Sequence, residues 1–409
     1  MRRLFVSVLL STLFAGTAHA DFTIPGFELV HTSPVETTLT NPDLRESLAV
    51  WTELFDGAKK EIVIAQFYAV SKPGTAFEKV LVSLTAAGQR GVKIRFLLDQ
   101  KGVGLSEAAT IAQIKAIPNL DLRLIDFNKV TGNGIVHAKY LAVDGQVAYI
   151  GSQNFDWRSF EHIHETGLKI TEPAMVNQVQ AIFEQDWQAQ ALTSQGSRAT
   201  VLNSKVVPAN YAQNAFLLAS PNAYNPAGVG DSETGLPALL AQAQSEVRIQ
   251  LLDYAPLSYG PNRTRPYYAV VDNAVRAAAQ RGVKIKLMVS AWNTEAPAIA
   301  YLKSLALVPN VEIRIVTIPA ASTGFIPFAR VIHSKTMTID GKLAWVGTSN
   351  WAGGYFDLSR NLEVVLRNEQ MAQRIAALHE QTWSSAYAQP IDINKQYPKP
   401  AKAAPQGKE

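Results

Sequence analysis

The chain has 409 residues, of which 47% are hydrophobic and 18% charged, and its formal net charge is +4. These values are typical of a folded protein with room for two domains, and they exclude a wholly disordered chain. The absence of cysteine excludes disulfides and thiolate metal sites. Without Arg2 and Arg3 the charge is +2, from 36 basic and 34 acidic side chains, which is too mild to indicate a nucleic-acid partner.

The first twenty residues have the features of a secretory signal peptide. Arg2 and Arg3 precede an apolar run over residues 4–15, and an Ala-His-Ala sequence at residues 18–20 resembles a cleavage site. The apolar run is shorter than the roughly 20 residues that a membrane-spanning helix needs. We therefore predict cleavage before Asp21 and a periplasmic or secreted protein without a transmembrane span. An uncleaved anchor is the alternative.

An internal repeat divides the chain into two similar halves. The sequence Gln-Arg-Gly-Val-Lys-Ile occurs at residues 89–94 and again at residues 280–285, an offset of 280 − 89 = 191. Residues 118–123 and 309–314 are similar at the same offset, and two His-x-Lys motifs follow at 333 − 137 = 196. The halves therefore keep one order of elements, which indicates a duplicated domain.

The predicted elements run in the same order in both halves. In the first half they are a buried strand at 61–68, a helix at 77–89 that ends near Gly91, and a strand at 92–98. In the second half they are a strand at 246–254, a helix at 268–280 that ends near Gly282, and a strand at 283–289. Strand, helix and strand in this order predict a parallel βαβ unit. Two further β-rich segments flank each His-x-Lys motif, and closing helices are expected at 174–189 and 370–385.

We therefore predict an α/β fold of two tandem domains, each a mixed sheet flanked by helices, related by pseudo-twofold symmetry. After the signal peptide at residues 1–20, the domains would span 21–190 and 216–389 with a linker at 191–215. Residues 390–409 are rich in Pro, Lys, Ala and Gln, which predicts a disordered tail.

Six residues recur in the same order in each half. The first set is His137, Lys139, Asp144, Ser152, Asn154 and Glu165, and the second is His333, Lys335, Asp340, Thr348, Asn350 and Glu363. Positions i and i+2 of a strand face the same side, so each His-x-Lys pair would project an imidazole and an ammonium into one cleft. Histidine can act as nucleophile or as acid and base, while Lys and Asn can donate to phosphate oxygens. The duplicated set indicates one phosphodiester site built from both halves.

The acidic residues of these sets allow two interpretations. Asp144 and Asp340 are each followed by Gly, which is typical of a hairpin turn, so they serve either the turn or the chemistry. Glu165 and Glu363 are expected to accept the Nδ1 proton of a histidine and so orient its Nε2 toward phosphorus, as in a catalytic triad. The alternative is that they are surface carboxylates.

The pattern HxKxxxxD followed by GSxN, twice in one chain, resembles the signature of the phospholipase D superfamily. The sequences at 151–159 and 347–356 are most similar to the branch with the lysosomal phospholipases D3 and D4 and the poxviral envelope and nicking-joining proteins. The resemblance covers nearly all of the mature chain, although the cysteines of the lysosomal members are absent.

The resemblance implies a phosphodiesterase that requires no metal or other cofactor. His137 would attack phosphorus to give a phosphohistidine, and His333 would protonate the departing oxygen and later act as base. The near-identical motifs leave the reverse assignment open. The phosphate would be held by Lys139, Lys335, Asn154 and Asn350.

Residues beyond the motifs are further candidates. Trp157, Trp351, Tyr355 and Phe356 could stack a base or line an acyl groove, and core packing is the alternative. Arg158 could bind phosphate or pair with a carboxylate.

Two histidines and two loops complete the set of candidates. His162 and His164 could mimic a metal-binding pair, but no third ligand follows at a useful spacing, so a surface or supporting role is expected. Residues 131–134 and 322–327 precede the two His-x-Lys motifs and are expected to form rims of the cleft.

Three functional hypotheses follow. The first is a phospholipase D that cleaves or exchanges a phospholipid head group, favoured by export to a membrane-bounded compartment and compatible with peripheral membrane contact. The second is an exonuclease on single-stranded DNA or RNA, favoured by the sequences beside the motifs. The third is a binding or envelope protein without activity, against which both intact motifs argue. Because one chain supplies both histidines, a monomer is sufficient.

Overall fold

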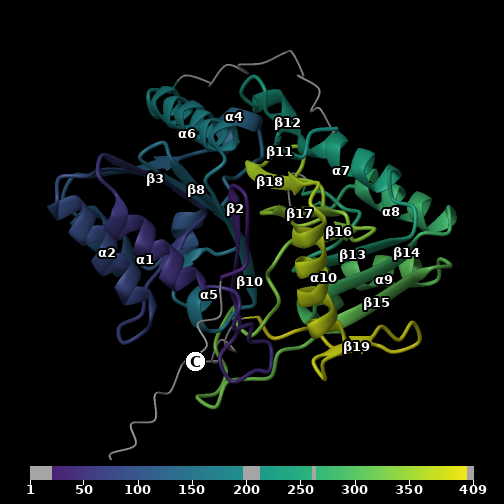
Figure 1. Cartoon of the computed structure of the whole chain (residues 1–409). Coiled ribbons are helices and arrows are strands. Elements are labelled where there is room, and N and C mark those ends of the chain that lie inside the picture. The colour runs from purple at the N-terminus through teal and green to yellow at the C-terminus, as the bar shows by residue number, and fades with distance from the viewer. Residues whose placement is uncertain (1–20, 197–211, 260–263, 403–409) are drawn as a thin grey trace, which may run out of the picture.

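The computed structural model describes residues 21–196, 212–259 and 264–402, and its elements form two similar halves (Figure 1). The main sheet of the first half contains β1 (Thr23–Ile24), β2 (Phe27–Thr32), β3 (Glu61–Gln66), β5 (Lys93–Asp99), β6 (Leu120–Ile125), β7 (Tyr140–Val143), β8 (Val147–Gly151) and β10 (Glu165–Ile170). A small second sheet pairs β4 (Ala69–Val70) with β9 (Phe155–Asp156). The helices are α1 (Ser47–Gly57), α2 (Phe77–Gln89), the 3-10 helix η1 (Gly102–Leu105), α3 (Ala108–Lys115), α4 (Asn128–Thr131), α5 (Arg158–Glu161) and α6 (Pro173–Ser194).

The second half repeats this construction. Its sheet contains β11 (Ala215–Ser220), β12 (Gly230–Asp231), β13 (Glu246–Leu251), β14 (Lys284–Ser290), β15 (Val311–Val316), β16 (Thr336–Ile339), β17 (Leu343–Gly347), β18 (Asn361–Leu366) and β19 (Ala388–Pro390). Its helices are η2 (Asn222–Tyr224), α7 (Ser232–Ala241), α8 (Val270–Gln280), η4 (Ala291–Thr294), α9 (Ala298–Ala306) and α10 (Glu369–Trp383).

The two main sheets correspond strand for strand. The order β2-β10-β8-β7-β3-β5-β6 in the first half matches β11-β18-β17-β16-β13-β14-β15 in the second. In each, the last three strands are parallel and the neighbouring hairpin strands are antiparallel. The predicted α/β fold with two mixed sheets is therefore confirmed.

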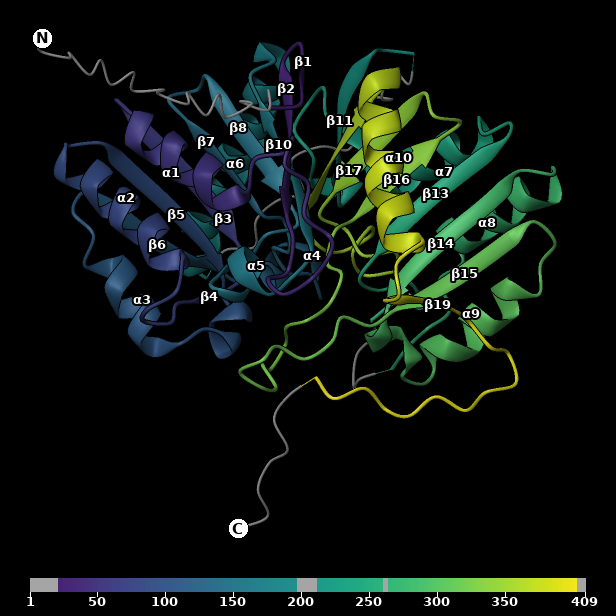
Figure 2. The ribbon, with the colours of Figure 1, turned by 60° about the horizontal axis from the view of Figure 1, so that its bottom comes forward.

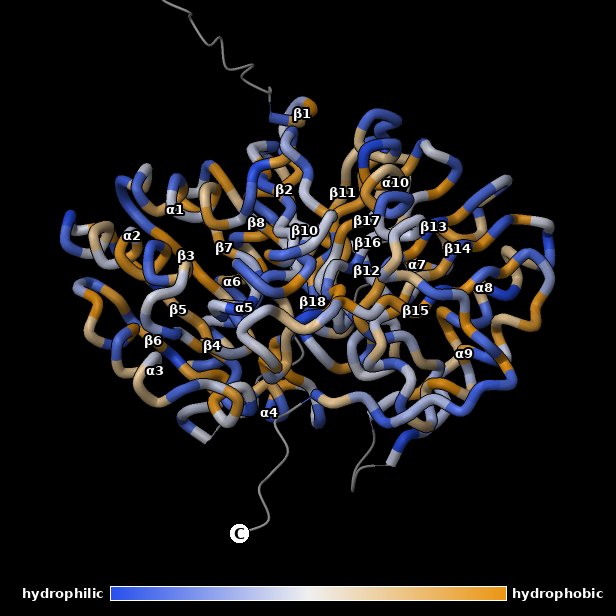
Figure 3. Tube along the Cα trace, turned by 90° about the horizontal axis from the view of Figure 1, so that it is seen from below, coloured by the Kyte–Doolittle hydropathy of each residue, from blue (hydrophilic) through white to orange (hydrophobic). Residues whose placement is uncertain are grey.

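Both sheets are covered on the outside by helices and share a core on the inside. Helices α1 and α2 pack on the outer face of the first sheet, and α7 and α8 pack on that of the second. The inner faces of both sheets join α6 and α10 in one apolar cluster. Hydrophobic residues follow the strands of both sheets, whereas hydrophilic residues gather in the peripheral loops (Figure 3). The shared core holds the two halves together. Residues that one half contributes to a site therefore keep a fixed position relative to those from the other half.

The prediction of a disordered tail needs correction for residues 390–402. Strand β19 pairs with β15, and the chain then runs past α9 (Figure 2), where Ile391 and Tyr397 pack on the core. Lys402 donates to Glu295 at 2.7 Å. Composition indicated disorder because it does not register these few anchoring contacts.

Several other predictions concern residues outside the described ranges. The signal peptide at 1–20, most of the linker (197–211) and the last residues (403–409) are among them. Helix α6 continues to Ser194, past the expected domain end at residue 190. Among the described residues, no helix combines the length and apolar character needed to cross a membrane.

Candidate active site

Each His-x-Lys motif lies in an extended segment directly before a hairpin strand and is bonded to the other half of the molecule. The amides of His137 and of the residue after it donate to the carbonyl oxygen of Arg360, at 3.0 and 2.9 Å. The amides of His333 and of the residue after it donate to the carbonyl oxygen of His164, at 2.8 and 3.0 Å. The two halves thus exchange equivalent contacts, and neither motif is positioned by its own half alone.

The two histidines line one cavity of about 830 Å³, together with Asn154 and Asn350. The exposed fraction is 6% for His137 and 7% for His333, so little more than the reactive edge of each ring meets solvent. The side-chain oxygens of both asparagines are buried without a hydrogen-bond partner. Unpaired polar atoms at a buried site indicate a place for a polar ligand.

Lys139 and Lys335 lie completely buried behind the histidines. Each Nζ donates to the carbonyl oxygen of the histidine two residues before it, at 2.5 Å for Lys335. Burial lowers the pKa of both ammonium groups, to about 7 for Lys335. A bound phosphate would raise these pKa values, because an anion nearby favours the ammonium form.

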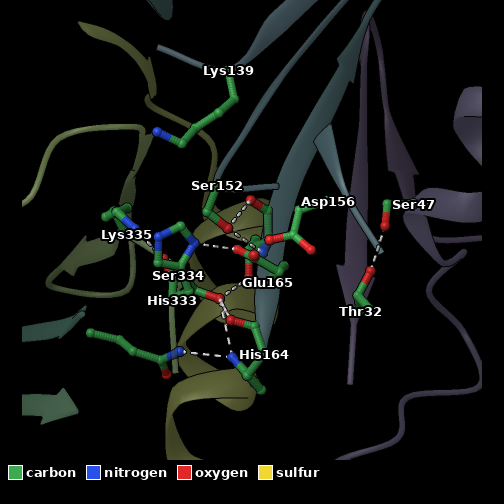
Figure 4. A network of polar contacts seen from close by, with 12 residues as sticks. Thr32, Ser47, Lys139, Ser152, Asp156, His164, Glu165, His333, Ser334 and Lys335 are labelled. Carbon is green, nitrogen blue, oxygen red and sulfur yellow. Dashed lines mark hydrogen bonds and ion pairs between the residues drawn. The ribbon is translucent and has the colours of Figure 1, made fainter. Parts of the chain in front are cut away.

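The Nδ1 atoms of the two histidines have different partners, and each partner comes from the opposite half. Nδ1 of His333 lies 2.8 Å from Oε2 of Glu165 (Figure 4), whereas Nδ1 of His137 lies 3.0 Å from Oδ1 of Asn361. Asn361 was missed by the sequence reasoning. The motif offset would have found it, because 361 − 165 = 196, the same as between the two histidines.

The expectation that Glu363 supports a histidine needs correction. Its carboxylate is buried and accepts hydrogen bonds from Ser232 and Ser349 instead. Residues 361 and 363 lie two apart on β18 and therefore on the same face of the strand. Matching by residue type selected the carboxylate, while the register of the strand places the amide against the ring.

The charges around the two imidazoles differ in the same way as their Nδ1 partners do. Burial lowers the pKa of His137 well below its usual value, and the ammonium groups of Lys139 and Lys335 lower it further. Burial also lowers the pKa of His333, but the carboxylate of Glu165 opposes this effect. The pKa of Glu165 itself is lowered, since His333 and Lys335 outweigh its burial. The protein thus favours a neutral His137 more strongly than a neutral His333.

Comparisons with known proteins identify the family of this chain. The family model described as "Cardiolipin synthase, PLD-like domain" matches residues 52–187 and 236–383, which is more than half of the chain. Phospholipase D Z of Dictyostelium discoideum is 31% identical over 368 residues, covering 83% of this chain and 85% of the relative. The chain belongs to the phospholipase D superfamily. Similarity to the 5'-3' exonuclease PLD3 of Xenopus laevis is 30% over 391 residues, covering 85% of this chain and 76% of that protein.

The fold is shared with solved structures at low sequence identity. A phosphatidylserine synthase from Haemophilus influenzae Rd KW20 superimposes with a TM-score of 0.63 at 12% identity, covering 87% of this chain and 88% of the other. The relatives that share this chain's sequence are named phospholipases D or exonucleases, which are both phosphodiesterases. As a member of the superfamily with both motifs intact, the protein is a phosphoric diester hydrolase.

The aspartates of the two phospholipase D motifs serve turns and do not contact the histidines, which corrects their place among the residues that orient the site. Asp144 and Asp340 both have positive φ, and each precedes a glycine that also has positive φ. The Asp144 carboxylate accepts three backbone N–H bonds from residues 59–61, and Asp340 accepts three from residues 244–246. Each aspartate therefore ties a hairpin turn to the start of the neighbouring strand.

The hydroxyl residues of the two phospholipase D motifs hold the strands that support the histidines. Ser152 Oγ accepts from the amide of Thr166 at 3.0 Å and so fixes the start of β10 beside Glu165. Thr348 Oγ1 donates to Oδ1 of Asn361 at 2.9 Å. Both residues act behind the histidines and not in contact with the cavity.

Of the five substrate-contact candidates in this phospholipase D-like cleft, three line the cavity. Tyr355 packs edge-on against His137, with ring centroids 4.8 Å apart, and Trp157 lies under the ammonium of Lys72. Arg158 lines the cavity, but it is paired with Asp156 and donates to the Pro327 carbonyl oxygen.

Trp351 and Phe356 belong to the core of the second half instead. Their position could not be distinguished from Trp157 and Tyr355 by sequence, because all four follow the motifs at similar distances. The sequence reasoning missed five other aromatic side chains that line the cavity: Phe67, Tyr68, Tyr259, Trp292 and Phe328.

The remaining candidates lie around the cleft. His162 is half-buried beside Glu161, whereas the His164 ring points to His31 and Ser334, so the two histidines do not share a ligand site. Asn133 of the first expected rim and residues 326–327 of the second line the cavity.

Proposed function

We propose that the protein is an exported phospholipase D that hydrolyses or transfers the head group of a phospholipid. The observation that carries this proposal is the apolar character of the cleft from the histidines to its mouth. Leu105, Tyr259 and Phe328 line the cavity and are 54%, 38% and 43% exposed. Large apolar side chains exposed around a cleft are typical of contact with lipid or protein.

The charges at the cleft also suit a phospholipid at a membrane surface. Lys72, Lys101 and Glu107 line the cavity and leave a net charge of +1 (two cations and one anion), whereas the charge of Arg158 is balanced by Asp156. Two cations beside an apolar rim would attract an anionic bilayer while the rim enters its surface. We propose this peripheral contact for the mature protein, which the predicted signal peptide would direct to the periplasm or the exterior.

The proposed reaction has two steps. In the first step Nε2 of His137 forms a bond to phosphorus, and the bond between phosphorus and the leaving oxygen breaks. The leaving oxygen keeps the electron pair of that bond and accepts a proton from Nε2 of His333. Water or an alcohol then transfers a proton to His333 as its oxygen bonds to phosphorus, and the P–N bond breaks to return its electron pair to His137. Lys139, Lys335, Asn154 and Asn350 would donate to the phosphate oxygens. A single chain supplies every group, so we propose a monomer.

A second candidate is a single-stranded nucleic-acid exonuclease. It is favoured by the relatives named 5'-3' exonuclease and by the aromatic rings of Tyr259, Trp292 and Phe328 along the cleft. Such rings could stack successive bases.

A paired assay separates these functions. Wild-type protein is incubated in EDTA with mixed phospholipid vesicles and, in parallel, with a 5'-hydroxyl single-stranded oligonucleotide, and His137→Ala serves as the inactive control. Release of head groups from the vesicles by the wild type would support the phospholipase. Phe328→Ser should reduce this release at least tenfold and should still cleave a soluble short-chain phospholipid. Release of nucleotides alone would assign the exonuclease, and no release from either substrate would contradict both.

A further inference from the structure

We propose that Asn361 and Glu165 are positioning residues that give the two catalytic histidines different and non-interchangeable roles. Asn361 holds His137 as the nucleophile, and Glu165 holds His333 as the acid and base. This inference rests on the two-histidine mechanism proposed above and applies to a lipid or a nucleic-acid substrate alike.

The amide of Asn361 is fixed in one orientation. The residue is completely buried, its Nδ2 donates to the Tyr355 carbonyl oxygen at 2.9 Å, and its Oδ1 accepts from Thr348 Oγ1 at 2.9 Å. The oxygen therefore faces Nδ1 of His137, 3.0 Å away. Because an amide oxygen only accepts, the proton of His137 must lie on Nδ1, and Nε2 keeps its lone pair for phosphorus.

The hydrogen bond to Asn361 raises the pKa of His137, but the amide carries no net charge, and burial and the two ammonium groups outweigh this effect. The charged or titratable groups that act on this ring are the ammonium groups of Lys139 and Lys335 and the imidazole of His333, and all of them disfavour the imidazolium. A neutral ring with a free Nε2 lone pair is the form that a nucleophile needs.

The environment of His333 opposes the imidazolium less strongly, because a carboxylate offsets part of the effect of burial on its pKa. Glu165 is completely buried, and its Oε2 lies 2.8 Å from Nδ1 of His333. A carboxylate at this distance stabilises the imidazolium. The ammonium groups of Lys335 and Lys139 destabilise it. His333 can thus hold protons on both nitrogens and release the one on Nε2 to the leaving oxygen, while the proton on Nδ1 stays with the imidazole.

The reverse assignment is disfavoured on both sides. It would require a neutral nucleophile beside the Glu165 carboxylate and an imidazolium beside the Asn361 amide and two ammonium groups. The motifs are nearly identical, so only the residues behind them break the symmetry.

Trapping the covalent intermediate tests the assignment directly. The probe is bis(p-nitrophenyl) phosphate, whose leaving group departs without a proton. His333→Ala should release about one equivalent of p-nitrophenol and retain a phosphorylated His137, identified by acid-free peptide mass spectrometry. His137→Ala should give neither. Phosphate on His333 would overturn the assignment while leaving the two-histidine mechanism in place, whereas turnover by wild type with no phosphohistidine in either variant would overturn both.

The pH dependence of kcat/KM tests the two positioning residues. In Asn361→Asp a carboxylate joins His137, so the acidic limb of the profile should move to higher pH. In Glu165→Gln the basic limb should move to lower pH, and turnover should fall by about 10²-fold or more for an alkyl leaving group but much less for p-nitrophenolate. Glu363→Gln is the matched control, a buried carboxyl that contacts serines, and should move neither limb. Equal losses for both leaving groups with unmoved limbs would reduce Asn361 and Glu165 to structural roles and overturn the proposal.

Discussion

The two halves of the molecule agree at the residues that face the cleft and differ one layer behind them. His137 and His333 line the cavity together with Asn154 and Asn350. The buried Lys139 and Lys335 are also alike, because each donates to the carbonyl oxygen of the histidine two residues before it. The residues behind differ in pairs at the offset of 196: Glu165 against Asn361, and His164 against Arg360. In the proposed mechanism the duplicated fold supplies two similar groups for one phosphate, and the supporting residues make their surroundings chemically different.

Lack of space explains why the first half has no carboxylate at the position equivalent to Glu363. The position equivalent to Glu363 is Gly167, where an added Cβ would lie 2.2 Å from the hydroxyl oxygen of Tyr149. In the second half the ring at this place is Trp345, and Glu363 packs beside it and Gly347. A tyrosine in one half and a buried carboxyl in the other thus fill the space between the same two strands.

Removing the charge of Arg360, a position at which the two halves differ, should have the largest effect on the free energy of unfolding. Its guanidinium is completely buried, is paired with Asp186 at 2.9 Å and also donates to two backbone carbonyl oxygens, whereas the equivalent His164 is held by neutral side chains. Arg360→Met should lower the free energy of unfolding by about 3–5 kcal/mol, because it leaves a buried aspartate unpaired. Urea denaturation measures the loss.

Arg374→Met is the control for this change. Its partner Asp43 is 35% exposed, so the loss should be less than about 1 kcal/mol. Equal losses in the two variants would show that the buried pair does not anchor the second half.

Replacing the two buried lysines should affect activity more than stability. Lys139→Met and Lys335→Met each remove a proposed donor to the phosphate, so kcat/KM should fall by about 10²–10³-fold. The free energy of unfolding should not fall, since methionine fills the space without the cost of burying an ammonium. Lys72→Met, at the rim, should change activity on a soluble diester less than tenfold. Loss of stability with retained activity would contradict the role of either lysine.

Glu363 should make stability depend on pH in a way that Gly167 cannot. Burial raises the pKa of its carboxyl to about 7, above the value of about 4.3 expected in the unfolded chain. Between these values the folded state keeps the proton that the unfolded state has released, so stability falls as pH rises through this window. Relative to wild type, Glu363→Gln should gain up to roughly 3 kcal/mol between pH 4.5 and 7. Parallel unfolding curves for both proteins at pH 5 and 7 would refute this origin of the pH dependence.

Sequence patterns predicted the elements well where local rules decide them. The helix expected at 77–89 is α2, and Gly91 beyond its end has φ of +88°, a conformation that suits glycine. The Nδ1 partner of His137 was mispredicted because residues 361 and 363 share one strand face, so periodicity alone cannot choose between them. That choice depends on how β18 lies against the opposite half, which is a tertiary contact without a local signature.

The aspartates of the two motifs provide the mildest test, because here the halves are alike. Asp144→Asn and Asp340→Asn each remove a charge that accepts three backbone N–H bonds, and asparagine tolerates the positive φ that both positions require. Each variant should lose about 1–2 kcal/mol of unfolding free energy, measured by urea denaturation, with kcat unchanged within about twofold. The loss should be somewhat larger for Asp340→Asn, because Asp340 also accepts a hydrogen bond from Ser245 Oγ at 2.7 Å. A tenfold fall in kcat of a fully folded variant would return that aspartate to the chemistry and would mean that the turn is not its main role.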